Sequence, residues 1–194
     1  MKPNLKLIGG QKIESPKSDL TRPTTLMVRE AVFNILKNKV ENSSWLDLFS
    51  GSGSIACEAY NHGAKKIVAI EKDRITAAIC SRNLSSLRKS NESKVYVKVI
   101  CKDVLAWTNP NRKHNSEIIS SQKIIFDFIY IDPPYKNNIY DSVLKNIFSS
   151  NYINTNTIVI CEHSKYTKIK ENNLWEIIDK RSYGQTQITF LIKI

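Results

Sequence analysis

Apolar residues follow helical spacing from Val28 onward, and the same spacing returns in the segment 138–149. The first segment carries its apolar positions at Val28, Ala31, Val32, Ile35 and Leu36. Positions spaced in this way lie on one face of a helix, so we expect that face to pack against a core. Thr24 or Thr25, which follow Pro23, are suitable residues to cap the helix N-terminus.

Short apolar runs of strand length alternate with the helical segments. We expect strands at 45–49, 66–70, 95–100, 124–131 and 157–160, and helices from about 54, at 74–88 and at 138–149. Two later runs, 174–178 and 187–194, are joined through Tyr183-Gly184 and are typical of an antiparallel pair. The pattern predicts an α/β fold, a Rossmann-like, doubly wound, mostly parallel sheet of seven strands with a C-terminal antiparallel hairpin.

Two segments stand outside this alternation. Residues 1–23 are expected to form a short N-terminal arm with a strand at 5–8 and a turn at Gly9-Gly10, ahead of a single domain at 24–194. The segment 108–122 is polar and basic without periodicity, which is typical of a surface loop or an insertion.

The charge balance changes what the chain is expected to bind. Twenty-nine Lys and Arg against eighteen Asp and Glu leave a net charge of +11 on 194 residues. This favours a polyanionic partner, most simply a nucleic acid, although a generically basic surface is the alternative.

Other residue types exclude several classes of protein. The four Cys form no C-x-x-C pair and the three His are scattered, so we expect reduced thiols and no metal site. No apolar run approaches the roughly 20 residues of a membrane span, and no secretory signal is visible at the N-terminus. A cytoplasmic location without membrane attachment is therefore expected, and nothing in the sequence indicates more than a monomer.

The turn after the first core strand has the composition of a cofactor site. Gly51, Gly53 and Ala56 match G-x-G-x-x-A between a predicted strand and a predicted helix. Glycines in such a turn let the backbone approach a ligand closely. Glu71, twenty residues after Gly51, ends the next strand and is suited to accept hydrogen bonds from ribose hydroxyls. Asp103 ends the third strand and could meet an adenine amino group or simply cap a helix.

A second motif follows the fourth predicted strand. In Asp132-Pro133-Pro134-Tyr135 the two prolines stiffen the turn and remove two N–H donors. What remains is a carboxylate and carbonyl oxygens, all acceptors, beside an aromatic ring. This arrangement suits a flat ring that carries an amino group, with Tyr135 stacking on the base while Asp132 and the Pro133 carbonyl accept from the nitrogen.

Together these motifs resemble the S-adenosylmethionine-dependent amino-methyltransferases. The block Arg22-Pro23-Thr24-Thr25, followed by Val28-Arg29-Glu30 and preceded by Ile8-Gly9-Gly10, is similar to the bacterial small-subunit ribosomal RNA guanine-N2 methyltransferases. The resemblance runs from about Leu5 to the C-terminus. It implies a class I methyltransferase fold, S-adenosylmethionine without a metal, and ribosomal RNA as partner, within a small-subunit particle.

The resemblance also implies roles for individual residues. The catalytic residues that it implies are Asp132, Pro133, Pro134 and Tyr135. The cofactor would lie against Asp47, Phe49, Ser50, Gly51, Gly53, Glu71, Lys72, Asp103 and Val104. Arg22, Thr24 and Arg29 are candidates for RNA contact, although Arg22-Pro23-Thr24 could instead close over the cofactor and Arg29 could form a surface ion pair with Glu30.

Alternative functions use the same motifs differently. Adenine N6 or cytosine N4 of DNA would fit the same amino-group chemistry, because Asp132-Pro133-Pro134-Tyr135 does not choose the base. A nucleic-acid-binding protein on a degenerate cofactor fold would need neither motif. An NAD-dependent dehydrogenase is the weakest alternative, since no residue is available as an acid or base for hydride transfer.

Overall fold

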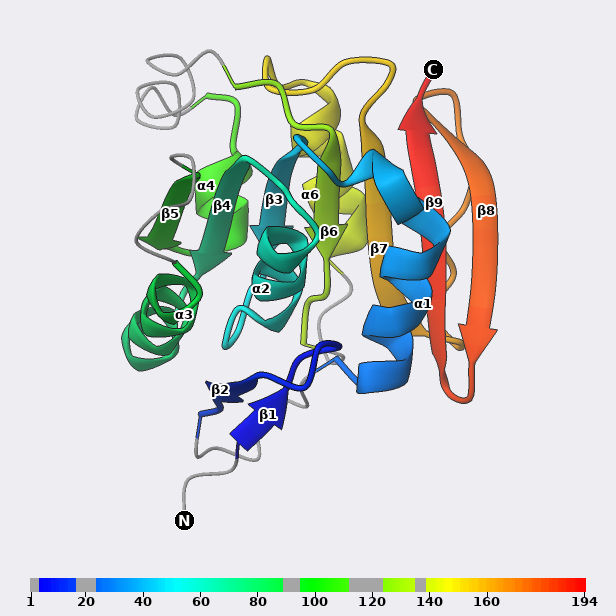
Figure 1. Ribbon diagram of the computed structural model, residues 1–194. Coiled ribbons are helices and arrows are strands. Elements are labelled where there is room, and N and C mark those ends of the chain that lie inside the picture. The colour runs from blue at the N-terminus through cyan, green and yellow to red at the C-terminus, as the bar shows by residue number, and fades with distance from the viewer. Residues whose placement is uncertain (1–3, 17–23, 89–94, 112–123, 135–138) are drawn as a thin grey trace.

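The computed structural model describes residues 4–16, 24–88, 95–111, 124–134 and 139–194, and its centre is a seven-stranded sheet (Figure 1). The sheet contains β3 (Ser44–Leu48), β4 (Lys66–Glu71), β5 (Tyr96–Cys101), β6 (Phe128–Ile131), β7 (Ile158–Ser164), β8 (Trp175–Tyr183) and β9 (Thr186–Lys193). The helices are α1 (Leu26–Leu36), the short 3-10 helix η1 (Lys37–Lys39), α2 (Ser54–Asn61), α3 (Arg74–Ser86), α4 (Val104–Thr108) and α6 (Tyr140–Phe148).

The strand order β5-β4-β3-β6-β7-β9-β8 confirms the predicted fold. The strands β5, β4, β3, β6 and β7 are parallel, and β9 joins β7 and β8 antiparallel. From β3 the chain builds outward to β4 and β5, then returns to place β6 on the other side of β3. This reversal creates a switch point between β3 and β6, where α/β sheets of this type bind their ligands beyond the carboxyl ends of the strands.

Helices cover both faces of the sheet. In Figure 1, α1, α2 and α3 lie on one face and α4 and α6 on the other. Strand β3 is buried from both sides, with Trp45 packed in the core under α1 and Leu46 in the core under α6. This explains why two apolar residues, Trp45 and Leu46, follow each other in its sequence instead of alternating with polar ones. Among the described residues, no helix is both long and apolar enough to cross a membrane.

The N-terminal residues form a hairpin rather than the single strand expected at 5–8. Strands β1 (Asn4–Lys6) and β2 (Lys12–Glu14) pair antiparallel around a turn in which Gly10 has φ +81°. The hairpin lies at the carboxyl edge of the sheet (Figure 1). The Ile8 amide donates to Glu58 of α2 at 2.9 Å and the Glu14 amide donates to Asn83 of α3 at 2.8 Å. These two bonds attach the hairpin to the helices beside the switch point.

The predicted start of the fourth core strand is wrong. The run 124–131 was expected to be strand throughout, but β6 begins only at Phe128. Before it, the Phe126 amide donates to the Tyr152 carbonyl of a loop, and the Asp127 carboxylate accepts from the Ser44 amide. Ile124 and Phe126 are buried outside any strand, and periodicity alone does not distinguish such residues from a strand. The short helix α4 was not predicted, and most of the segment 108–122 lies outside the described residues.

Candidate functional site at the carboxyl edge

Acidic side chains stand at the ends of five neighbouring strands. Asp47 is in β3, Glu71 ends β4, Asp103 follows β5, Asp132 follows β6, and Glu162 is in β7. Because all five strands are parallel, these residues meet at one edge, as the sequence predicted for the first four. Glu162 was not predicted. Its signal in the sequence is a charged residue directly after the apolar run Ile158–Cys161.

The turn after β3 has an unusual backbone. Phe49, Gly51 and Gly53 have φ values of 63°, 54° and 79°. At Gly53 an added Cβ would lie 2.5 Å from the Cys80 sulfur of α3, whereas at Gly51 it would meet nothing within 4 Å. Gly53 is therefore required by close packing of the turn on α3. The open side of Gly51 is where a ligand could approach the backbone.

Ser50 attaches this turn to β4 and α3. Its amide donates to the Ile70 carbonyl of β4 at 2.9 Å, and its hydroxyl lies 3.8 Å from the Cys80 sulfur. Ser50 is buried, so its side chain supports the turn.

Asp47 caps helix α2 from a distance. The N-cap residue Gly53 has no side chain, and the Asp47 carboxylate instead accepts from the Ala56 amide in the first turn, at 3.1 Å. Burial raises the pKa of Asp47 to about 8; the Ala56 hydrogen bond opposes this shift and the negative charge of Glu71 adds to it. Burial at the switch point therefore favours the protonated form of Asp47.

Glu71 is held between two turns. One carboxylate oxygen accepts from the Gly51 amide at 3.0 Å and the other accepts from the Asp73 amide at 2.8 Å. Each carboxylate oxygen has two lone pairs, so acceptor capacity remains for two hydroxyl groups. Lys72, the next residue, is exposed. This geometry suits the ribose contact that the sequence indicated for Glu71.

Asp103 performs the structural role that the sequence left open. One of its carboxylate oxygens accepts from the Ala106 amide at 3.0 Å and caps α4. The residue is exposed at the edge while Val104 is buried under it. Capping one oxygen does not exclude the adenine contact, which stays a prediction.

Asp132 begins the loop that leaves β6. It is partly buried, with Pro133 buried and Pro134 exposed after it. The Thr24 hydroxyl donates to its carboxylate at 3.3 Å. Burial raises the pKa of Asp132 well above its usual range, the neighbouring negative charge of Glu162 raises it further, and the Thr24 hydrogen bond opposes both.

Glu162 forms the buried floor of this site. The Tyr130 hydroxyl donates to its carboxylate at 2.7 Å, and the Thr24 hydroxyl also lies within hydrogen-bonding reach. Burial raises the pKa of Glu162, against the hydrogen bonds from Tyr130 and Thr24 and the positive charge of Arg29. Asp132 and Glu162 thus each raise the cost of a negative charge on the other side of this site, and hydroxyl donors from Thr24 and Tyr130 offset part of it.

The structure gives Arg29 a different place from the one predicted. Its side chain is fully buried, and its guanidinium donates to Glu58 at 3.2 Å and to the carbonyls of Thr24 and Lys6. Burial of the guanidinium overturns direct RNA contact, and the ion pair is with Glu58, not on the surface with Glu30. Arg29 instead joins α1, α2 and the N-terminal hairpin, and it fixes the backbone of Thr24.

The remaining predicted residues fall outside the described part of the chain. Arg22 and Tyr135 belong to this group, so their roles stay predictions. Thr24 is buried and touches Asp132, which makes it part of the site rather than a surface contact for RNA.

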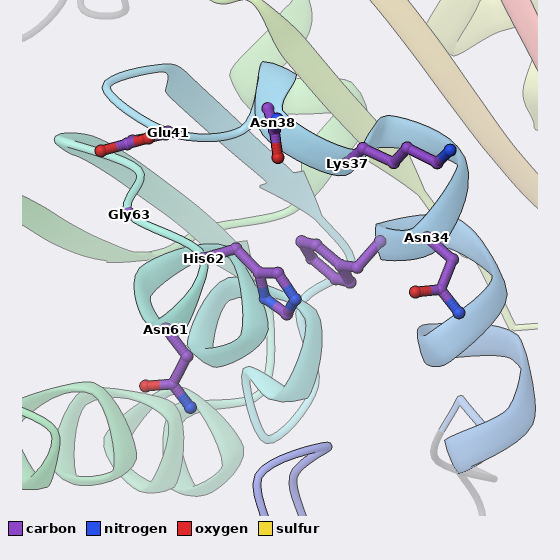
Figure 2. Close-up of a pocket in the computed structure, with 8 residues that line it drawn as sticks. Asn34, Lys37, Asn38, Glu41, Asn61, His62 and Gly63 are labelled. Carbon is purple, nitrogen blue, oxygen red and sulfur yellow. The ribbon is translucent and has the colours of Figure 1, made fainter.

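Two cavities lie away from this edge. One of about 500 Å³ is lined by residues from the C-terminal ends of α1 and α2, including Asn34, Asn61 and His62 (Figure 2). It opens at the amino edge of the sheet, where the His62 ring stacks on Phe33 with centroids 4.6 Å apart. None of the predicted site residues lines it. Among the described residues, no group of three or more His, Cys, Asp or Glu could hold a metal ion.

Comparison with known proteins places the chain in a family. The family model described as conserved hypothetical protein 95 matches residues 6–192. The chain belongs to this family. The match runs from the end of β1 to the end of β9 but one residue, so all the site residues described above lie within the family's extent.

Individual relatives agree with the resemblance found in the sequence. The protein named ribosomal RNA small subunit methyltransferase D of Haemophilus influenzae is 27% identical over 175 residues, which cover 90% of this chain and 84% of the relative. A putative methyltransferase, yhhF, of Escherichia coli shares the fold with a TM-score of 0.77 at 21% identity, covering 98% of both chains.

A more distant structure carries a cofactor product. A putative methyltransferase solved in complex with SAH has a TM-score of 0.66 at 13% identity and matches all of this chain and 56% of its own. At this identity the likeness shows the fold alone.

Proposed function

We propose that this protein transfers a methyl group from S-adenosylmethionine to the exocyclic N2 of a guanine in small-subunit ribosomal RNA. The observation that carries the proposal is the acidic edge at the switch point, with Asp132 and the Pro133-Pro134 turn beside Asp47. The name of the Haemophilus relative supports the RNA substrate, and the net charge of +11 is consistent with it.

The residues present fit this cofactor. Gly51 leaves open space at the edge, and Glu71 offers acceptors fixed by two backbone amides. The exposed Asp103 carboxylate is suited to an adenine amino group. S-adenosylmethionine supplies an activated methyl group on a sulfonium, so the protein has only to bind and orient the acceptor.

Asp132 then acts on the amino group. The lone pair of an exocyclic nitrogen is delocalised into the ring, which makes it a weak nucleophile. Hydrogen bonds from that nitrogen to Asp132 and to the Pro133 carbonyl favour a pyramidal nitrogen with its lone pair directed at the methyl group. After transfer the nitrogen has one proton in excess, and the Asp132 carboxylate is the group that accepts it.

The base must leave its helix to reach this edge. Enzymes that modify a base flip it into the active site, and an aromatic side chain stabilises the flipped base by stacking. We assign this stacking to Tyr135, on the sequence motif. Tyr135→Phe keeps the ring and should retain activity that Tyr135→Ala loses.

The test is transfer of labelled methyl to unmodified ribosomal RNA, to small-subunit particles and to duplex DNA, followed by nucleoside analysis. We expect N2-methylguanosine in the ribosomal substrates. N6-methyladenine or N4-methylcytosine in DNA would instead establish the alternative substrate with the same chemistry.

A variant tests the role of Asp132 directly. Asp132→Ala should abolish transfer and leave S-adenosylmethionine affinity within a few-fold of wild type, measured by calorimetry. The matched control is Asp141→Ala, which removes an exposed acid from α6. Activity of Asp132→Ala comparable with the control would refute the assignment.

A further inference from the structure

The turn after β7 presents an aromatic ring to solvent. Tyr166 is 78% exposed, the highest value for a large apolar side chain among the described residues. Aromatic rings in proteins are usually at least partly covered, so a ring this exposed is available to a partner.

The backbone under this ring is well fixed. The Thr167 amide donates to the Ser164 carbonyl at 2.9 Å and the Tyr166 amide donates to the Ser164 hydroxyl at 3.3 Å. The Lys165 amide donates to the Gln185 carbonyl of the β8–β9 turn at 2.9 Å. The exposed ring is therefore carried on a preorganised turn, which lowers the entropy lost when a partner binds.

The turn lies at the same edge as the methyl-transfer site. Strand β7 is parallel to β6, and Ile131 pairs with Cys161, so Asp132 and Glu162 are level with each other. Tyr166 follows Glu162 by four residues, which at about 3.3 Å per residue is at most about 13 Å beyond the level of Asp132. A few stacked nucleotides, at roughly 3.4 Å each along a strand, span this distance.

Two lysines belong to the same turn as the ring. The Lys165 ammonium lies 5.2 Å from the centroid of the Tyr166 ring, and Lys168 is exposed in the same turn. Arg181 on the neighbouring β8 is paired with Asp179 at 3.0 Å and contributes little net charge. With Lys165 over one face, the other face of the ring remains for stacking.

We propose that the turn Lys165–Lys168 is an RNA-contact site, in which Tyr166 stacks on an unpaired base beside the target nucleotide and Lys165 and Lys168 bind phosphates. An aromatic ring flanked by cations is the arrangement with which proteins bind single-stranded nucleic acid. The inference rests on the proposed function, since it takes RNA as the substrate.

The test measures RNA binding separately from catalysis. Affinity for unmodified small-subunit ribosomal RNA is measured by filter binding for wild type, Tyr166→Ala and Tyr166→Phe. We expect Tyr166→Ala to weaken binding about tenfold, because stacking of one base contributes a factor of that order, and Tyr166→Phe to bind like wild type. S-adenosylmethionine affinity should not change in either variant.

The charges are tested by salt dependence. The double variant Lys165→Ala/Lys168→Ala should lower the slope of log affinity against log salt by about 1 to 2. The control is Lys39→Ala, which removes an exposed lysine at the amino edge of the sheet and should lower the slope less than the double variant does.

The outcomes separate this inference from the proposed function. If wild type methylates ribosomal RNA and Tyr166→Ala binds that RNA equally well, the contact site is refuted while the function stands. If wild type neither binds nor methylates ribosomal RNA, the proposed function fails and this inference falls with it.

Discussion

Gly53 offers a sharp test of how the site is built. Gly53→Ala would introduce a Cβ 2.5 Å from the buried Cys80 sulfur, at a residue whose φ is +79°. Gly51→Ala is the matched control, because it has the same kind of backbone, with φ +54°, and open space around the new Cβ. The two variants differ mainly in the contact with Cys80.

Two effects determine how much stability each variant loses: the left-handed backbone and, at Gly53, the contact with Cys80. A left-handed backbone destabilises an L residue by roughly 1–2 kcal/mol, and the stiffer unfolded chain of the alanine variant offsets part of that. Forcing a methyl group into a packed core adds about 1–3 kcal/mol. We therefore expect a loss of about 1 kcal/mol for Gly51→Ala and about 2–4 kcal/mol for Gly53→Ala. Cys80 is fully buried, so its sulfur cannot turn toward solvent to relieve the contact.

Urea unfolding of the cofactor-free protein, followed by circular dichroism, measures both losses. The double variant Gly53→Ala/Cys80→Ala should recover about 1–3 kcal/mol relative to the sum of the single variants, since the clash is absent. The packing argument is refuted if Gly51→Ala and Gly53→Ala are equally destabilised, or if the double variant shows no recovery.

Two further predictions concern the buried acids. Glu162→Gln removes the negative charge beside Asp132 and should lower the pKa of the Asp132 carboxyl, so the acid limb of the pH–kcat/KM profile should move to lower pH. The surface control Asp141→Asn should leave that limb in place. An unmoved limb in Glu162→Gln would contradict the coupling between the two acids. The second prediction concerns Asp47, whose folded pKa of about 8 lies above the ordinary 3.8. The contribution of Asp47 to the free energy of unfolding is therefore fully present below about pH 4 and is lost as pH rises through 8. Asp47→Asn should remove this decline in the free energy of unfolding, which reaches up to about 1.4 kcal/mol per pH unit. Urea unfolding between pH 5 and 8 without cofactor measures it. Equal slopes of unfolding free energy against pH in wild type and variant would contradict the prediction.

Local pattern was sufficient for most of the fold. The apolar spacing from Val28 predicted α1, and Thr25 caps it with its side chain accepting from the Val28 amide at 3.4 Å. The strand–turn–helix at Gly51 and Gly53 was also predicted, because positive φ angles leave a direct mark in glycine content. These features depend on residues within a few positions of one another.

The errors concern contacts between residues distant in sequence. Arg29 follows Val28 on α1 and has the charge of a surface residue, but it is buried because the hairpin and α2 close over it. Its partner Glu58 is 29 residues away, and the Lys6 carbonyl is 23 residues away in the other direction. Helical spacing describes one face of one helix and carries no information on what covers its first turn.

The position of Arg29 also links the N-terminal arm to the chemistry. Arg29 holds the Thr24 carbonyl, and the Thr24 hydroxyl donates to Asp132. The same guanidinium holds Lys6 of the hairpin and Glu58, which in turn accepts from the Ile8 amide. Removing one partner of a buried ion pair destabilises a protein by about 3–5 kcal/mol, because the other charge is left uncompensated, so this link depends on both Arg29 and Glu58. Arg29 therefore joins the hairpin to Thr24, the residue whose hydroxyl donates to Asp132.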